Sequence, residues 1–167
     1  FNHDWEKLGF ESERLLAEIT GEKVETITNI ETFDLPKAGK EREAFVKIRV
    51  NQSFFRKAVL AAYDFKCCIT GLGIPELLNA SHIVPWSKDE VNRVNPRNGL
   101  CLNAIHDRAF DRGLLTITPE FKIKISKSIK HNDIDGALQD FLFRYDCSEI
   151  KMPTRFLPDT NFLKYHN

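Results

Sequence analysis

The feature that most constrains the fold of this chain is a series of short, well-separated segments in the middle of its sequence. Residues 77–86 contain an apolar stretch that predicts a strand, and the polar residues 87–97 predict a loop. Residues 99–102 are again short and apolar, which predicts a second strand. The two strands and their loop are the simplest unit in which a small sheet can form.

A helix is predicted directly after the second strand, over residues 104–112. Asn103 is a favourable N-cap for such a helix, and Gly113 is a favourable residue just beyond its end. The central part of the chain therefore has the order strand, loop, strand and helix. Together with the flanking segments, this order predicts an α+β fold.

The segments before this unit are predicted to be mostly helical. Residues 4–21 place apolar side chains at helical spacing, and the polar residues 22–42 are typical of a linker. Residues 44–50 alternate apolar and polar side chains, which predicts a short strand. Asn51 or Ser53 could then cap a second helix that ends near residue 63.

After the central unit, residues 113–125 predict a β-hairpin that turns at residues 118–120. Asp133 or Asp135 could begin a helix that runs to about residue 145, and the remaining residues predict an irregular tail. We therefore expect three parts. They are an N-terminal helix with an acidic linker (1–43), a central domain (44–130, with its core at 67–117) and a C-terminal helix and tail packed on that domain (131–167).

The charges of the chain sum to zero but are unevenly distributed. Acids outnumber bases in the first 35 residues, whereas bases dominate residues 37–57 and recur around and after the central unit. A zero net charge argues against a simple basic nucleic-acid binder. The uneven distribution leaves open a surface along which a polyanion could lie, and equally a solvated charged face.

Composition also bears on the compartment. No apolar run approaches the roughly 18 residues that span a bilayer, so we expect no membrane association. The four cysteines form no CxxC pair, which favours free, mostly buried thiols in a reducing cytoplasm. The chain begins at Phe1 rather than Met, from which we expect a missing N-terminal recognition domain in a longer protein.

Two side chains of the central unit suit proton transfer. His82 lies at the end of the first predicted strand, and a neutral imidazole with a pKa near 7 can take a proton from an attacking water. Asn98 follows sixteen residues later, where its carbonyl could orient the base or bind a hard metal ion. A histidine with satisfied ring nitrogens and an ordinary Asn-Gly turn are the alternatives.

The predicted helix adds His106, Asp107 and Asp111. Asp107 and Asp111 are four residues apart and share a helix face, whereas His106 is rotated about 100° from Asp107. Both aspartates could pair with Arg108 and Arg112 instead of a metal ion. Asp111 lies in the last turn, where a carboxylate opposes the helix dipole and favours a compensating cation.

The ordered string AxHIVPW…NPxNGLCL…HDxAFDxG, within residues 67–117, resembles the HNH endonucleases, also called ββα-metal or His-Me finger nucleases. It is most similar to a branch that is common in restriction or defence proteins. In typical members a metal-binding histidine follows the asparagine by nine residues, and another ligand often follows four later. Counting from Asn98 leads to Asp107 and Asp111, with His106 one position short.

This resemblance implies a ββα-metal core and a divalent ion bound by Asp107, with Asp111, His106 or Asn98 as a further ligand. Oxygen-rich ligation implies Mg²⁺ or Mn²⁺, whereas participation of His106 would admit Zn²⁺ or Ni²⁺. Ser81 stands where many members have a metal-binding Asp or His before the base. The zinc-binding CxxC pairs of other branches have no counterpart here, so we expect no structural zinc.

The implied activity is hydrolysis of DNA phosphodiester bonds, with His82 as the general base and Asn98 and His106 as further catalytic residues. Lys88, Arg97, Arg108 and Arg112 are expected to contact the nucleic acid. One such site cuts one strand, so a homodimer or two successive cuts would be needed for a double-strand break. The alternatives are a nucleic-acid-binding module of the same fold that does not cut, and a protein-interaction domain with an acidic arm.

Overall fold

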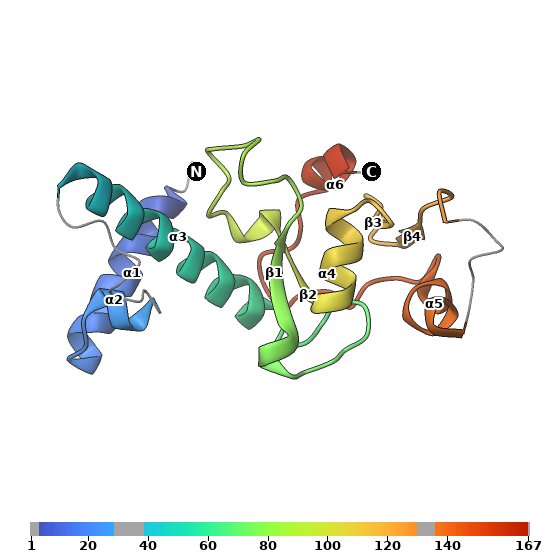
Figure 1. Ribbon diagram of the computed structural model, residues 1–167, viewed down its shortest axis with the longest axis horizontal. Coiled ribbons are helices and arrows are strands. Elements are labelled where there is room, and N and C mark those ends of the chain that lie inside the picture. The colour runs from blue at the N-terminus through green and yellow to red at the C-terminus, as the bar shows by residue number, and fades with distance from the viewer. Residues whose placement is uncertain (1–3, 29–38, 130–135, 167) are drawn as a thin grey trace.

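The computed structural model describes residues 4–28, 39–129 and 136–166 of the chain. Its helices and strands follow one another along an elongated molecule (Figure 1). Helices α1 and α2 (Val24–Ile27) lie at one end, and the long helix α3 runs from there to the sheet in the middle. Helix α5 (Gly136–Phe141) lies at the opposite end.

Helix α1 (Trp5–Thr20) confirms the helix expected over residues 4–21. It begins where the Asp4 carboxylate accepts a hydrogen bond from the Lys7 amide at 3.0 Å, and it ends at Gly21, which has a φ of +71°. Its buried residues are Gly9, Glu13 and Ala17. These residues are four apart, so they form one face of the helix, which packs against α3.

Helix α3 (Lys40–Ala62) is one continuous helix, and the strand expected at residues 44–50 is therefore wrong. The buried side chains Val50, Phe55, Val59 and Ala62 recur at helical spacing, and this pattern extends back through the half-buried Val46. Because helix propagation is cooperative, the alternating residues join the helix that follows them. Helix α3 crosses the domain boundary expected between residues 43 and 44, and we propose that this boundary lies before Lys40.

The central unit has the expected strand–loop–strand–helix order. Strands β1 (Leu78–His82) and β2 (Gly99–Asn103) are antiparallel, with Ala80 opposite Cys101. Helix α4 (Ala104–Asp111) follows directly, and the Asn103 side chain accepts hydrogen bonds from the Ile105 and His106 amides, as its N-cap role requires. The fold is thus α+β with a ββα core.

Helices α3 and α4 both pack on this small sheet, and the main hydrophobic core lies between them. Gly99 marks the closest approach of α3. A Cβ atom at this position would overlap the Val59 side chain and lie 3.0 Å from Cζ of Phe55. The glycine after Asn98 is therefore required by packing between a helix and a strand rather than by a tight turn.

The segments after α4 form a second small sheet and a wrapping tail. Strands β3 (Leu115–Ile117) and β4 (Ile123–Ile125) form the expected hairpin. Helix α5 is followed by a 3-10 turn at Phe143–Tyr145, and the helix starts expected at residues 133 and 135 lie outside the described residues. The tail is not wholly irregular, because it ends in helix α6 (Thr160–His166).

Two further expectations concern membrane-spanning helices and the cysteines. In the described part of the chain, no helix combines the length and the apolar character needed to cross a membrane. Cys67, Cys68 and Cys101 are buried free thiols, and Cys147 is an exposed one, as the sequence predicts.

Candidate active site

A cavity of about 330 Å³ lies beside strand β1, between helices α3 and α4. Among the described strands, β1 pairs with β2 alone, and three of its residues line this cavity. Three elements and the loop after β1 provide the lining residues, which are Gln52, Phe55, Arg56, Asn79, Ala80, His82, Trp86 and Asp107. Of the sequence-predicted site residues, the cavity brings together His82 and Asp107.

His82 is held in one orientation by three contacts. Its Nε2 atom lies 2.8 Å from the Arg93 carbonyl oxygen, which can only accept, so Nε2 carries a proton and donates it. The ring stacks on Phe55 at 3.8 Å between centroids with 9° between planes. Trp86 meets it edge-on at 5.6 Å. In the neutral ring, Nδ1 is therefore left as the proton acceptor.

Burial lowers the pKa of His82 below its ordinary value of about 6.5, although the Arg93 carbonyl and the Asp111 charge act in the opposite direction. The neutral form therefore predominates at neutral pH. A neutral, oriented imidazole in a cavity is the state that a general base requires.

Asp107 is held by two side chains of β1. Its Oδ2 atom accepts a hydrogen bond from Nδ2 of Asn79 at 2.7 Å, and its Oδ1 atom accepts one from the Ser81 hydroxyl. Asn79 and Ser81 are two residues apart on a strand, so they face the same side of the sheet, toward α4. Ser81, which stands where many HNH sequences have a metal ligand, thus positions a carboxylate instead.

Asp111 lies one turn further along α4, on the same face as Asp107. Burial and then the Asp107 charge raise the pKa of Asp111, with Arg108, His166 and Arg112 opposing this shift. Two carboxylates on one face that repel each other are stabilised by a cation between them.

The oxygen atoms at this point fit a hydrated Mg²⁺ or Mn²⁺ ion. Such ions keep several waters and need one or two carboxylates, which Asp107 and Asp111 can supply. Within the described ranges, no group of three or more His, Cys, Asp or Glu residues is arranged to hold a metal ion.

Asn98 has a different role from the two considered in the sequence. It is 1% exposed, and its Oδ1 atom accepts a hydrogen bond from the Val84 amide at 2.8 Å. Its Nδ2 atom donates to the carbonyls of Val84 and Asn92 at 3.1 and 3.3 Å. The side chain therefore closes the loop between β1 and β2, and this loop carries the Arg93 carbonyl that orients His82.

His106 is not brought to the cavity. It is 1% exposed, and its Nε2 atom lies 2.6 Å from the carbonyl oxygen of Phe141, with Tyr145 edge-on at 5.6 Å. Because it is rotated from Asp107 around α4, it faces the C-terminal segments rather than β1. The sequence hypothesis that His106 contributes to the metal site or to catalysis lacks a geometric basis.

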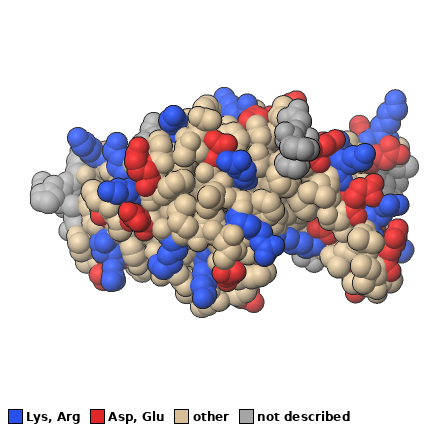
Figure 2. Space-filling model, turned by 180° about the vertical axis from the view of Figure 1, so that it is seen from behind, with Lys and Arg blue, Asp and Glu red and all other residues tan. Residues whose placement is uncertain are grey.

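The four expected nucleic-acid contacts are exposed, but none of them lines the cavity. Arg97 is engaged elsewhere, because it lies 3.5 Å from Asp159 and donates to the Leu157 carbonyl at 3.3 Å. In Figure 2, Lys and Arg side chains are interspersed with Asp and Glu over the face that is shown. This face of the molecule therefore shows no broad surface of Lys and Arg alone among the described residues.

Several lining residues are not among the site residues predicted from the sequence. Phe55, Gln52 and Arg56 come from helix α3, and Asn79 comes from β1. Asn79 could have been found from the sequence, because the polar side chains at positions 79 and 81 share one face of the predicted strand, opposite to the face of His82. The α3 residues could not have been found from a local sequence pattern, because they are far from His82 along the chain and approach it only in the folded protein.

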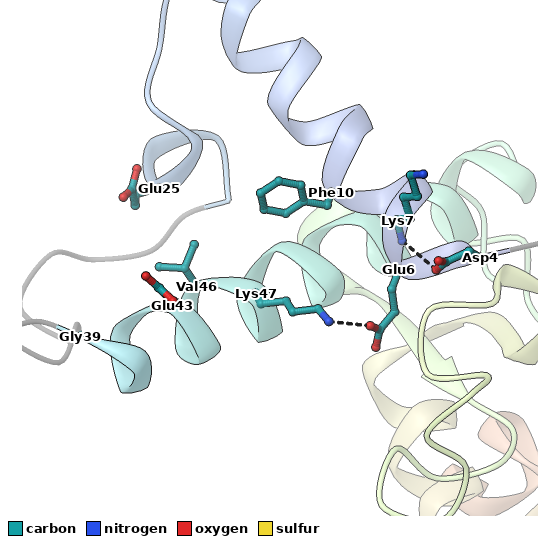
Figure 3. A pocket seen from close by; sticks show the side chains of 9 residues that line it. All are labelled: Asp4, Glu6, Lys7, Phe10, Glu25, Gly39, Glu43, Val46 and Lys47. Atoms are coloured by element: carbon teal, nitrogen blue, oxygen red, sulfur yellow. Dashed lines mark hydrogen bonds and ion pairs between the residues drawn. The ribbon is translucent and has the colours of Figure 1, made fainter.

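A larger hollow of about 760 Å³ lies near the N-terminus, between α1, α2 and α3. Its described lining residues include four carboxylates, Asp4, Glu6, Glu25 and Glu43, and two lysines, Lys7 and Lys47 (Figure 3). Lys47 is already paired with Glu6 at 2.9 Å. The excess of negative charge makes this hollow unsuitable for a phosphodiester.

The part of the chain that contains β1 and α4 is similar to a known family. Residues 67–118 match the model of a family described as HNH endonuclease. A solved structure described as a modification-dependent TagI restriction endonuclease is similar, with a TM-score of 0.41 and 22% identity over 67% of this chain. The chain spans 35% of the length of that structure. None of the curated proteins matches.

The matched segment begins at the buried Cys67, includes β1, the loop, β2 and α4, and ends after β3. It contains His82, Asn98, Asp107 and Asp111 in the order that the resemblance requires. Within residues 67–118, this chain is therefore similar to the endonucleases of the HNH family.

Proposed function

We propose that this domain hydrolyses DNA phosphodiester bonds, with His82 as the general base and one divalent ion at Asp107 and Asp111. The observation that carries the proposal is the orientation of His82. Its Nε2 proton is bound to the Arg93 carbonyl, while the cavity that it lines also holds Asp107.

In the proposed reaction, Nδ1 of His82 accepts the proton of a water that attacks phosphorus. The resulting imidazolium keeps its donor bond to the Arg93 carbonyl, which stabilises the new positive charge. Phe55 and Trp86 keep the ring from turning. Asn98 contributes through the loop rather than through contact with the reacting atoms.

Asp107 and Asp111 would hold the ion, with Asn79 and Ser81 fixing the first carboxylate. When bound, Mg²⁺ or Mn²⁺ would neutralise charge on the scissile phosphate and on the departing oxygen. HNH nucleases generally use a divalent ion, and the oxygen donors found here favour these two ions over Zn²⁺ or Ni²⁺.

A plasmid-nicking assay tests the proposal. We expect the wild-type protein to nick supercoiled DNA with Mg²⁺ or Mn²⁺ and to lose this activity in EDTA. His82→Ala should abolish nicking and leave the melting temperature nearly unchanged. Nicking by His82→Ala at the wild-type rate would remove His82 from the mechanism, and persistent nicking in chelator would remove the metal ion.

A second candidate function is nucleic-acid binding without cleavage. It is favoured by one observation, since both oxygens of Asp107 already accept hydrogen bonds from β1. This module would bind DNA with an affinity that falls as salt rises. It would not nick DNA, whichever metal ion is added. A metal panel in the nicking assay separates the two functions.

We further propose that the domain is the cleavage module of a restriction or defence protein, a setting suggested by the branch of sequences that it resembles. Expression of the natural protein should lower the plating efficiency of phage, and the His82→Ala form should not. Equal plating with the two forms would count against this setting without bearing on nicking in vitro.

A further inference from the structure

We propose that Arg56, supported by Gln52, forms the phosphate-binding wall of the active site, so that helix α3 binds the strand that is cut. This inference rests on the proposed nuclease function and adds a substrate-contacting element outside the HNH segment at residues 67–118.

Helix α3 has a fixed position relative to the base. Gln52 and Arg56 are four residues apart, so their side chains share the helix face that borders the cavity. Phe55, beside them, is 2% exposed and stacks on His82. Contact between Phe55 and His82 therefore sets the distance from Arg56 to the reacting centre.

Charge makes Arg56 the residue in this lining that can bind an anion. Among the described residues that line the cavity, Arg56 is the one Lys or Arg, and Asp107 is the one Asp or Glu. The planar donors of a guanidinium match phosphate oxygens, so an arginine can bind a phosphate through two parallel hydrogen bonds.

Arg56 is also available for a ligand. Its side chain is exposed and forms no ion pair with any described residue. Its hydrogen bond to the Pro75 carbonyl is long, at 3.4 Å. Lys57, the next residue, contrasts with it, because Lys57 is paired with the buried Glu13 at 2.8 Å.

The helix face that carries Gln52 and Arg56 has a further arginine toward the N-terminal end of α3. Arg49 lies seven residues before Arg56 on the same helix face, with its guanidinium 5.2 Å from the centre of the Phe45 ring. It also forms no ion pair among the described residues. Arg49 is therefore placed to contact a phosphate that flanks the one at the cavity.

Binding is tested first, in a His82→Ala background that cannot cut. Fluorescence anisotropy with a labelled DNA duplex over a salt series gives the slope of log Kd against log salt. Arg56→Gln should reduce this slope by about one unit, as expected for one lost phosphate contact, and Arg56→Lys should reduce it less. Arg49→Gln should also reduce it by about one unit. Lys124→Gln, an exposed lysine on β4, is the charge-matched control and should leave the slope unchanged.

Cleavage is tested second, with His82 present. Arg56→Gln should lower the nicking rate at saturating DNA by about 100-fold, because it removes a cation at the developing charge. Gln52→Ala should have a smaller effect in the same direction, and circular dichroism should show all variants folded. An unchanged salt slope for Arg56→Gln would overturn the phosphate contact, whatever its rate. Absence of nicking by wild type would instead count against the nuclease function, and the binding series would still decide the role of Arg56.

Discussion

At the scale of single residues, the two faces of strand β1 contact different helices. Asn79 and Ser81 face α4 and hold the Asp107 carboxylate, whereas His82 packs on Phe55 of α3. Alternation along the strand thus separates the positioning of the proposed metal ligand from the positioning of the proposed base. Each of these functions can be altered by a substitution that leaves the other in place.

Ser81→Ala tests the positioning of the carboxylate. Loss of the hydroxyl leaves Asp107 with one β1 donor, so we expect the Mg²⁺ concentration for half-maximal nicking to rise by about 10- to 100-fold. A metal titration of the nicking rate measures this change. Ser87→Ala, in the exposed loop after Trp86, is the control. An unaltered Mg²⁺ requirement would show that Asp107 needs no support from Ser81.

The pH profile tests the environment of the base. Burial lowers the pKa of His82, so the protonated, inactive form should accumulate only below the ordinary value of about 6.5. Nicking should therefore fall on the acid side at a pH below 6.5. Phe55→Leu removes the stacked ring and admits water, which should move this acid limb upward. Phe10→Leu, exposed on α1, should leave it in place, and an unmoved limb for Phe55→Leu would refute the role of the stack.

The sequence alone predicts only part of the set of residues that form the site. The order and spacing of His82, Asn98 and Asp107 are local properties, and the structure brings His82 and Asp107 to one cavity. His106 lies away from this cavity, and spacing alone does not show which face of α4 is buried. Arg56 could not be predicted, because the contact between Phe55 and His82 exists only in the folded chain.

At the scale of elements, α3 is as important to the site as the ββα unit. It lies against β1 and β2 and meets them at Gly99. The ββα order could be predicted because Asn103, Gly113 and the apolar stretches are local signals. The extent of α3 could not, because a seven-residue alternation resembles a strand until packing against α1 and β1 selects the helix.

Gly99→Ala tests this contact. The added methyl group must displace Val59 or Phe55, so we expect a loss of about 1–3 kcal/mol in the free energy of unfolding. Nicking should fall further than stability alone explains, because Phe55 supports His82. Chemical denaturation and the nicking rate measure the two effects. Gly73→Ala, where a methyl group meets only ordinary contacts at 3.5 Å, is the matched control. Equal stability of the two variants would contradict the close approach of α3.

At the scale of the whole molecule, the N-terminal arm, which is helix α1, is joined to helix α3 through a buried charge. Glu13 is 2% exposed and accepts from Lys57 at 2.8 and 3.0 Å and from Ser53 at 3.3 Å. A carboxylate in such a position depends on its cation, because an unpaired buried charge is strongly unfavourable.

Lys57→Met should therefore loosen α1 from α3. We expect amides of α1 to exchange hydrogen faster by about 10- to 100-fold, while amides of β1 and β2 keep their protection. Glu13→Gln together with Lys57→Met should restore much of the protection, because no charge is then buried alone. Uniform loss of protection throughout the chain would instead show that the arm and the nuclease core unfold as one unit.

The tail after β4 has a consequence for how the protein is made. The Lys151 amide donates to the Cys68 carbonyl at 2.7 Å, and the Thr154 amide donates to the Ala62 carbonyl at 2.8 Å. The Asp159 amide bonds the Arg97 carbonyl at 3.0 Å. Contacts between such distant parts of a chain form late and slow its folding. The segment at residues 67–118 therefore reaches its final packing only after the ribosome has also synthesised the tail that these bonds join to the rest of the chain.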